Sequence, residues 1–331
     1  MVAGEGRLTY ELVPDWEQLP AGWSHPDVAG VAVDSQDQVY VFNRGAHPVI
    51  VYDKDGRFLR SWGEGIFSRP HGITINNDVV YCADDTDHTV RAFRLDGTLL
   101  WTLGTLNKPS DTGYRPEGPS NLLSIHRGAG PFNRPTRLAV APNGDLYVSD
   151  GYGNARIHRF SPGGELRQSW GEPGDGPGQF HLPHSVWVHT DGRVFVCDRE
   201  NDRVQIFSPT GELLAIWTDL TRPGDLLIDS RGLVYVGEMA WQAGGISMAG
   251  KRHPETRSAC MTIRDLDGRL LVSWGGPDPC EPGSFASPHG ICLDSCGDLY
   301  VSEVTHTALS RDGRWHAACH SLQKFALRSD R

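Results

Sequence analysis

Residues 132–171 read FNRPTRLAVAPNGDLYVSDGYGNARIHRFSPGGELRQSWG, and this stretch decides the fold. Apolar and polar residues alternate in four short runs, at 138–140, 145–148, 156–160 and 166–171. Residues that favour turns, such as Asn143-Gly144 and Gly163-Gly164, separate the runs. The stretch therefore predicts four short β-strands in succession, each connected to the next by a tight turn.

The same pattern of four strands recurs along the chain in units of about 40 residues, which is typical of a β-propeller. We expect an all-β, six-bladed β-propeller in a single domain, residues 1–331, with blades at about 25–63, 67–104, 132–171, 180–217, 222–275 and 285–327. The last unit has room for only three strands, so we expect residues 8–12 to add the fourth and close the ring. A β-sandwich or two small β domains are the alternatives, but the recurrent Trp-Gly at the ends of units disfavours both.

Composition excludes several classes of function. The net charge of −10 argues against a nucleic-acid-binding surface, which would be basic. No apolar stretch is long enough to span a membrane, and residues 1–15 lack the apolar core of a secretion signal. The seven cysteines show no CxxC spacing, so we expect a reduced, cytoplasmic protein rather than a disulfide framework.

A Pro-His pair precedes the first strand of every second unit. The three pentapeptides are RPHGI at 69–73, LPHSV at 182–186 and SPHGI at 287–291. The first strand of a propeller blade lies nearest the axis, and alternate blades are related by about a third of a turn. We therefore predict that His71, His184 and His289 converge on the axis and bind one metal ion. Zinc suits three imidazoles with an open fourth position, although other transition metals also accept imidazole.

Other polar residues are expected at the end of the ring where the histidines lie, which we call the mouth. Successive strands are antiparallel, so the start of each first strand and the end of each second strand lie at this same end. One repeat position, after each second strand, carries a carboxylate that we expect to cap backbone N–H groups of turns: Asp84, Asp150, Asp198, Glu238 and Glu303.

The turns after the second strands also contain residues that are not repeated from unit to unit: Arg44, Tyr152 and Arg199. Because they do not repeat, a structural role in every blade explains them less well than a role in a site. Arginine can pair with a substrate carboxylate, and a tyrosine beside a cation and a metal can act as a base. The long segments 105–131 and 240–258 break the repeat and are expected at this mouth, as lids or as surface loops.

The repeats resemble those of NHL-repeat propellers. More narrowly, the chain resembles the peptidyl-α-hydroxyglycine α-amidating lyases in Asn43–Gly45, Pro70–Gly72, Arg134–Thr136, Tyr147–Tyr152 and Asp198–Asn201. The resemblance implies a zinc ion on His71, His184 and His289, Tyr152 as the base, and active-site arginines at Arg44 and Arg199. It also implies a lyase that cleaves the N–Cα bond of an N-acyl carbinolamine to an amide and glyoxylate.

The chain departs from this family at several positions. The family's calcium-binding carboxylate corresponds to Gly290, with backbone ligands at Val28 and Ile73, so a structural Ca²⁺ is in doubt. Family disulfide positions correspond to Gly153, Phe195 and Ile206, so those bridges are absent. The chain also contains no copper monooxygenase domain that would supply a hydroxyglycine.

Two alternative functions stay open at this point. A metal-dependent hydrolase, such as a lactonase or an amidase, would use the same open metal to activate water. A non-enzymatic NHL propeller would use the mouth as a binding platform. We expect a small-molecule or peptide substrate, no nucleic acid and no membrane, and the sequence leaves the oligomeric state open.

Overall fold

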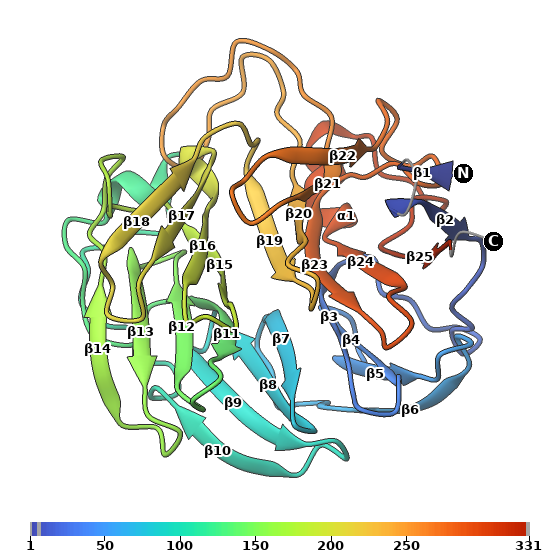
Figure 1. Cartoon of the computed structure of the whole chain (residues 1–331), viewed down its shortest axis with the longest axis horizontal. Coiled ribbons are helices and arrows are strands. Elements are labelled where there is room, and N and C mark those ends of the chain that lie inside the picture. Colours follow the sequence, from blue (N-terminus) through green and yellow to red (C-terminus); the bar gives the residue numbers. More distant parts are fainter. Residues whose placement is uncertain (1, 5–7, 329–331) are drawn as a thin grey trace.

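Six antiparallel β-sheets surround a central axis (Figure 1), which confirms the predicted six-bladed β-propeller. The computed structural model describes residues 2–4 and 8–328. The first three blades consist of β3 (Val28–Val33), β4 (Val39–Asn43), β5 (Val49–Tyr52) and β6 (Phe58–Trp62); β7 (Pro70–Asn76), β8 (Val79–Asp84), β9 (Thr89–Arg94) and β10 (Leu99–Leu103); and β11 (Pro135–Val140), β12 (Leu146–Asp150), β13 (Arg156–Phe160) and β14 (Leu166–Trp170).

The next two blades are regular, and the sixth combines both ends of the described chain. They consist of β15 (Pro183–Val188), β16 (Val194–Asp198), β17 (Arg203–Phe207) and β18 (Leu213–Trp217); β19 (Pro223–Ile228), β20 (Val234–Glu238), β21 (Cys260–Arg264) and β22 (Leu270–Trp274); and β23 (Pro288–Leu293), β24 (Leu299–Glu303), β25 (Leu322–Leu327), β2 (Tyr10–Val13) and β1 (Val2–Ala3). Tyr10–Val13 pairs antiparallel with β25, so the ring closes as predicted, with the strand slightly later than residues 8–12.

The blades are held together by apolar clusters at their interfaces. Each of the six interfaces buries one such cluster between the faces of neighbouring sheets. The recurrent tryptophan belongs to this packing, because Trp62, Trp170 and Trp217 each cover a turn glycine of the next blade: Gly97, Gly211 and Gly268. Each of these glycines has a positive φ, and a Cβ atom would come within 2.9 Å of the indole ring.

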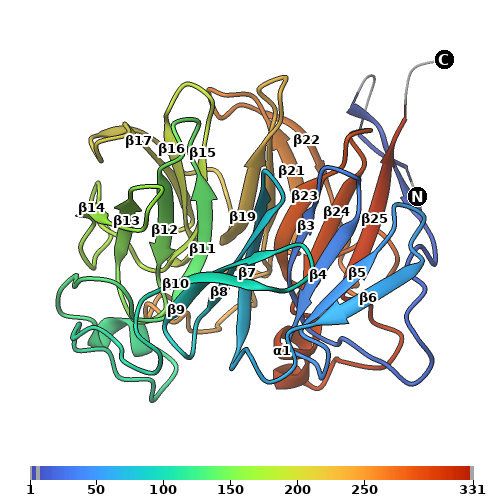
Figure 2. The same ribbon diagram turned by 90° about the horizontal axis from the view of Figure 1, so that it is seen from below.

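Helical segments are short and lie between strands. They are α1 (Thr305–Leu309) and the 3-10 turns η2 (Asn121–Ser124), η3 (Arg199–Asn201) and η4 (Ser310–Asp312). The 105–131 connection and α1 lie at the same face of the ring (Figure 2). Within the part of the chain that the structure describes, no helix has the length and apolar character needed to cross a bilayer.

One disulfide contradicts the expectation that all cysteines are reduced. Cys280 and Cys319 are bonded and connect the loop before β23 to the segment between β24 and β25. The sequence did not indicate this pair, because its 39-residue separation matches no regular motif. Structural disulfides persist in oxidising compartments, so the cysteines no longer favour the cytoplasm.

Removal of this disulfide is expected to destabilise the protein without changing the fold. Closing a loop of 39 residues restricts the unfolded chain, which corresponds to roughly 3–4 kcal/mol of stability. Chemical denaturation of Cys280→Ser/Cys319→Ser should therefore show a lower free energy of unfolding than the unmodified protein. Cys296→Ser, which changes an exposed free cysteine, is the control. A double variant as stable as the control would contradict the expectation.

Candidate metal centre

The three predicted histidines meet at the axis. Each is the second residue of an innermost strand, β7, β15 or β23, and each is almost fully buried. The ring centroids are 4.8 Å apart for His71 and His184 and 4.6 Å apart for the other two pairs. One nitrogen from each ring lies within 4.8 Å of the others, so the predicted convergence of His71, His184 and His289 is confirmed.

Each imidazole is oriented by a backbone carbonyl of the following blade. Nδ1 of His71 donates to Thr136 O at 2.8 Å, Nδ1 of His184 to Gly224 O at 2.6 Å, and Nδ1 of His289 to Ala29 O at 2.7 Å. A carbonyl oxygen can only accept a hydrogen bond, so Nδ1 carries the proton in all three rings. Nε2 therefore presents a lone pair in each case, which is the form that binds a metal ion.

The electrostatic surroundings favour the neutral imidazoles that such a site needs. Burial, together with the positive charge of neighbouring groups, holds the pKa of His71, His184 and His289 well below the usual value for histidine. Nε2 of His71 is also a buried atom without a hydrogen-bond partner among the described residues. A polar atom in that position is explained by a ligand that the structure does not contain, and a transition-metal ion fits it.

The repeated carboxylates fix the chain just before each histidine. Asp84 accepts hydrogen bonds from Ser68 N and Arg69 N at 2.6 and 2.9 Å. Asp198 accepts from His181 N at 2.9 Å. The predicted capping role is therefore confirmed in both blades, and it positions the backbone on which the ligand histidines stand.

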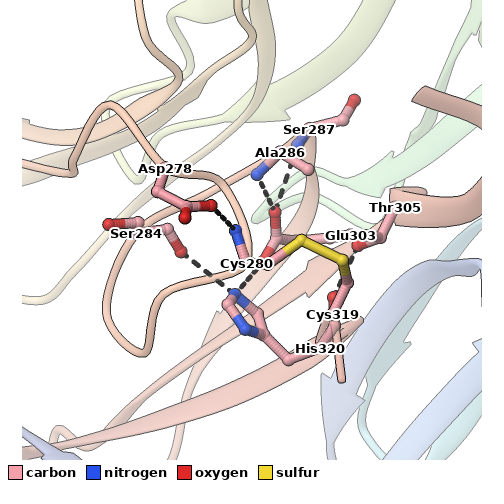
Figure 3. Close-up of a disulfide and its surroundings, with 9 residues drawn as sticks. All are labelled: Asp278, Cys280, Ser284, Ala286, Ser287, Glu303, Thr305, Cys319 and His320. Carbon is pink, nitrogen blue, oxygen red and sulfur yellow. Dashed lines mark hydrogen bonds and ion pairs between the residues drawn. A yellow bond between two sulfur atoms is a disulfide. The ribbon is translucent and has the colours of Figure 1, made fainter. Parts of the chain in front are cut away.

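The corresponding carboxylate of the sixth blade lies beside the disulfide. Glu303 accepts from Ala286 N and Ser287 N at 2.7 and 3.1 Å, and it pairs with His320 at 3.2 Å. Figure 3 shows His320 next to Cys319, with its imidazole joined to the Glu303 carboxylate. The bridge thus supports the segment that leads into His289.

Tyr152 lies beside the histidines. Its hydroxyl oxygen is 3.2 Å from His184 Nε2 and accepts a hydrogen bond from Arg199 Nη1 at 3.1 Å. The guanidinium groups of Arg69, Arg134 and Arg199 all lie within 5.9 Å of the centre of its ring. Three guanidinium groups therefore surround the ring of Tyr152.

The two predicted arginines have different surroundings. Arg199 is fully engaged, because it also donates to Glu200 at 2.8 Å and contacts Met248 Sδ at 3.3 Å. Arg199 and Arg222 hold the pKa of Glu200 at about 2, although burial would raise it. Arg44 donates from Nε to Pro70 O at 3.2 Å, and its buried Nη2 has no partner in the described structure. Arg44 is therefore the arginine that is free to bind an anion.

Three further arginines at the mouth were missed from the sequence. Arg69, Arg134 and Arg222 each stand immediately before the proline that opens an innermost strand. They pair with carboxylates that were also missed: Arg69 and Arg134 with Asp85, and Arg222 with Glu200 at 2.8 Å. The repeated Arg-Pro dipeptide was the signal that could have identified them.

The two long insertions meet over this mouth. Leu122 N of the first donates to Met248 O of the second at 3.1 Å. Leu122 and Ile125 pack with Tyr152 and Leu182, and Met248 packs against this cluster. The insertions therefore cover Tyr152, as the interpretation of these segments as lids requires.

The implied calcium ion does not fit this structure. A Cβ atom at Gly290 would lie 2.7 Å from the Cα atom of Gly30, so the strands leave no room for a carboxylate side chain there. Asp225, a carboxylate within the channel, is already paired with Arg137. The channel widens beyond this pair into a cavity of about 530 Å³ at the opposite end of the ring.

The chain carries NHL repeats, since the profile of this repeat matches residues 132–160 and 180–207. Human NHL repeat-containing protein 3 is 35% identical over 227 residues, which are 64% of this chain and 61% of that protein. The peptidyl-glycine alpha-amidating monooxygenase B of Xenopus laevis is 30% identical over 348 residues, 91% of this chain and 35% of that protein. The peptidyl-alpha-hydroxyglycine alpha-amidating lyase 1 of Drosophila melanogaster is 29% identical over 264 residues, 75% of this chain and 45% of that protein.

The chain thus spans between 35% and 61% of the length of these relatives. Solved structures with a similar fold include a streptogramin B lyase, with a TM-score of 0.59 and 14% identity, covering 96% of this chain and 98% of that one. A gluconolactonase from Xanthomonas campestris has a TM-score of 0.59 and 13% identity, covering 92% of this chain and 88% of that one. At such low identity the structural similarity shows the fold alone.

Proposed function

We propose that this NHL-repeat propeller, a relative of the amidating enzymes at about 30% identity, is a metal-dependent lyase. Its substrate would be an N-acyl carbinolamine such as an α-hydroxyglycine amide, and its products an amide and an aldehyde such as glyoxylate. One observation carries the proposal: three imidazoles converge on the axis, and the Tyr152 hydroxyl lies 3.2 Å from Nε2 of His184.

His71, His184 and His289 would hold the metal, and the donor set of three neutral imidazoles suits zinc. When bound there, zinc would act as a Lewis acid that favours ionisation of the substrate hydroxyl. The three carbonyls that orient the rings would keep the ligands in place before the metal binds, which limits the cost of ordering the site.

Tyr152 would act as the base. Its phenolic oxygen would accept the proton of the carbinol hydroxyl, the electrons of that O–H bond would form the aldehyde C=O bond, and the C–N bond would break. The amide nitrogen would then take up a proton, so that no water or oxidant is consumed. Arg199 would hold the Tyr152 oxygen in position and stabilise its charge, because it donates to that oxygen at 3.1 Å.

Arg44 would bind the carboxylate of the substrate. Its Nη2 is buried without a partner among the residues described, and a carboxylate oxygen would satisfy it. The low solvation of this guanidinium lowers the pKa of Arg44, and the nearby Arg69 adds to that effect, so an anion is favoured at this point. Arg199 is less suited to this role because each of its three guanidinium nitrogens already has a partner.

Arg44→Gln is expected to weaken cleavage of substrates that carry a carboxylate. A lost charge-assisted hydrogen bond costs about 1.5–3 kcal/mol, which corresponds to roughly 10–150-fold in kcat/KM. A substrate whose carboxylate is replaced by a neutral amide should be cleaved equally by the variant and the unmodified protein. If Arg44→Gln affects both substrates alike, Arg44 does not recognise the carboxylate.

The direct test of the function is to incubate zinc-loaded protein with an N-acyl-α-hydroxyglycine and to measure the amide and glyoxylate. Protein treated with a chelator is the control. Absence of glyoxylate from the metal-loaded protein would refute the proposal for this substrate class. Reaction in ¹⁸O-labelled water separates the lyase from the alternative hydrolase, because hydrolysis of an ester or amide places the label in the carboxylate that is formed.

A further inference from the structure

A buried ion pair crosses the channel next to the histidines. Arg137 of β11 and Asp225 of β19 are ion-paired, with 8% and 1% of their side chains exposed. Both line the same small cavity as His71, His184 and His289. Neither residue has a place in the chemistry proposed above, so their position beside the metal centre needs a separate explanation.

The pair occupies equivalent positions in two blades. The third residue of the innermost strand is, from the first blade to the sixth, Gly30, Gly72, Arg137, Ser185, Asp225 and Gly290. Those of the second to fifth blades line the small cavity beside the histidines. Four of the six are glycine or serine. At the three glycines a Cβ atom would come within 2.9 Å of an atom of the neighbouring innermost strand, so the strands pack closely here. Only Arg137 and Asp225 place charged side chains at this position.

Asp225 is bonded to the strands that carry two of the ligands. It accepts a hydrogen bond from Ser185 Oγ at 2.6 Å, and Ser185 is adjacent to His184. It also accepts from Ile291 N at 2.9 Å, two residues after His289. A single carboxylate thus connects the fourth, fifth and sixth blades below the site.

The same two residues adjoin the carbonyls that orient the imidazoles. Arg137 directly follows Thr136, whose carbonyl accepts from His71, and Asp225 directly follows Gly224, whose carbonyl accepts from His184. The ion pair therefore sets the separation of two strands that fix two of the three rings. The pair places one positive and one negative charge in the channel. Because these charges balance each other, no further cation is needed to neutralise Asp225.

We propose that the Arg137–Asp225 pair is a positioning element of the metal centre, which holds the three histidines at the spacing that a metal ion requires. This inference rests on the metal site of the proposed function. It also accounts for the misfit of calcium, because a fixed guanidinium and its carboxylate occupy the channel instead.

The test uses Co²⁺ as a spectroscopic probe of the histidine site in the full chain. Arg137→Met/Asp225→Asn removes both charges together, so no unpaired charge is buried. We expect this variant to bind Co²⁺ about 10–100-fold more weakly and to show an altered d–d absorption spectrum. Effects of this size are typical when residues that orient the metal ligands are changed. Native Co²⁺ affinity and an unchanged spectrum in the folded variant would overturn the inference.

The matched control is Arg159→Met/Asp145→Asn, which removes another ion pair with a buried carboxylate, in the third blade at a distance from the histidines. It should lower the melting temperature but keep the Co²⁺ affinity and spectrum. If Arg137→Met/Asp225→Asn does not fold, Arg137→Lys is used instead. This variant keeps the positive charge but loses the planar guanidinium that can donate two hydrogen bonds to a carboxylate. An unchanged Co²⁺ spectrum in Arg137→Lys would count against the inference, and an altered spectrum would support it.

Two further measurements separate failure of the metal centre from failure of the ion pair to position it. Unmodified protein that binds no Co²⁺ would refute the metal centre itself, and with it the proposed function. Addition of Ca²⁺ should leave the melting temperature of the zinc-loaded, unmodified protein unchanged. A rise in melting temperature on adding Ca²⁺ would show that the channel still accepts a cation and would overturn the view that the ion pair replaces one.

Discussion

Replacement of His184 by alanine is expected to remove both the bound metal and the lyase activity. The variant keeps only two of three imidazoles, and two ligands hold zinc far more weakly than three. The chemistry would lose the Lewis acid, which contributes several kcal/mol, so we expect kcat/KM to fall by roughly 1,000-fold or more. Elemental analysis and glyoxylate release, measured on the same preparation, would show both losses together.

His189→Ala is the control for this experiment. His189 directly follows the same strand, β15, but lies at its other end, where it pairs with Asp191 at 3.0 Å. The control should retain metal and activity. A His184→Ala protein with full metal content and normal glyoxylate release would exclude a role for the three histidines in the reaction.

Tyr152→Phe is expected to separate chemistry from metal binding. The aromatic ring would still pack against Leu182 and the insertion residues Leu122 and Ile125, so the site should keep its shape and its metal. Only the phenolic oxygen is lost, and removal of a general base typically costs about 100–10,000-fold. We therefore expect a large fall in kcat, with metal content unchanged and KM little affected.

Tyr114→Phe provides the comparison for Tyr152→Phe. The Tyr114 hydroxyl accepts from Arg134 at 3.1 Å and from Asn121 at 3.2 Å, so it belongs to the covering loop rather than to the histidine site. Its loss should change kcat by less than about tenfold, because both hydrogen bonds lie in the covering loop and neither reaches the histidines. If Tyr152→Phe is no slower than Tyr114→Phe, another group is the base.

The ring and the convergence of the three histidines could be predicted because both patterns repeat in the sequence. Strand alternation recurs in every blade, and the Pro-His pair recurs at the same position of alternate units. Propeller geometry then brings residues 113 and 105 positions apart to one axis, as His71, His184 and His289 show. The local strand pattern and the symmetry of the ring both predict the same fold and the same position for the histidines, so one sequence is enough to predict them.

The features that do not repeat were not predicted. The Cys280–Cys319 bridge joins two irregular loops, and nothing in the sequence indicates that these loops are neighbours. The different roles proposed for Arg44 and Arg199 depend on which of their N–H groups are already hydrogen-bonded. Arg199 already donates to Glu200 and to the Tyr152 oxygen. The Arg137–Asp225 pair joins residues 88 positions apart, and its partners become visible only when the innermost strands are placed around the channel.

The hydrogen bond from each imidazole to the next blade links the metal centre to the integrity of the whole ring. Three innermost strands carry the histidines and the other three supply the carbonyls that orient them, so every blade contributes to one site. Outward movement of any single blade would displace either a ligand or its support. An ion bound at the axis would therefore oppose partial opening at all six interfaces, and its binding would make the blades unfold more cooperatively.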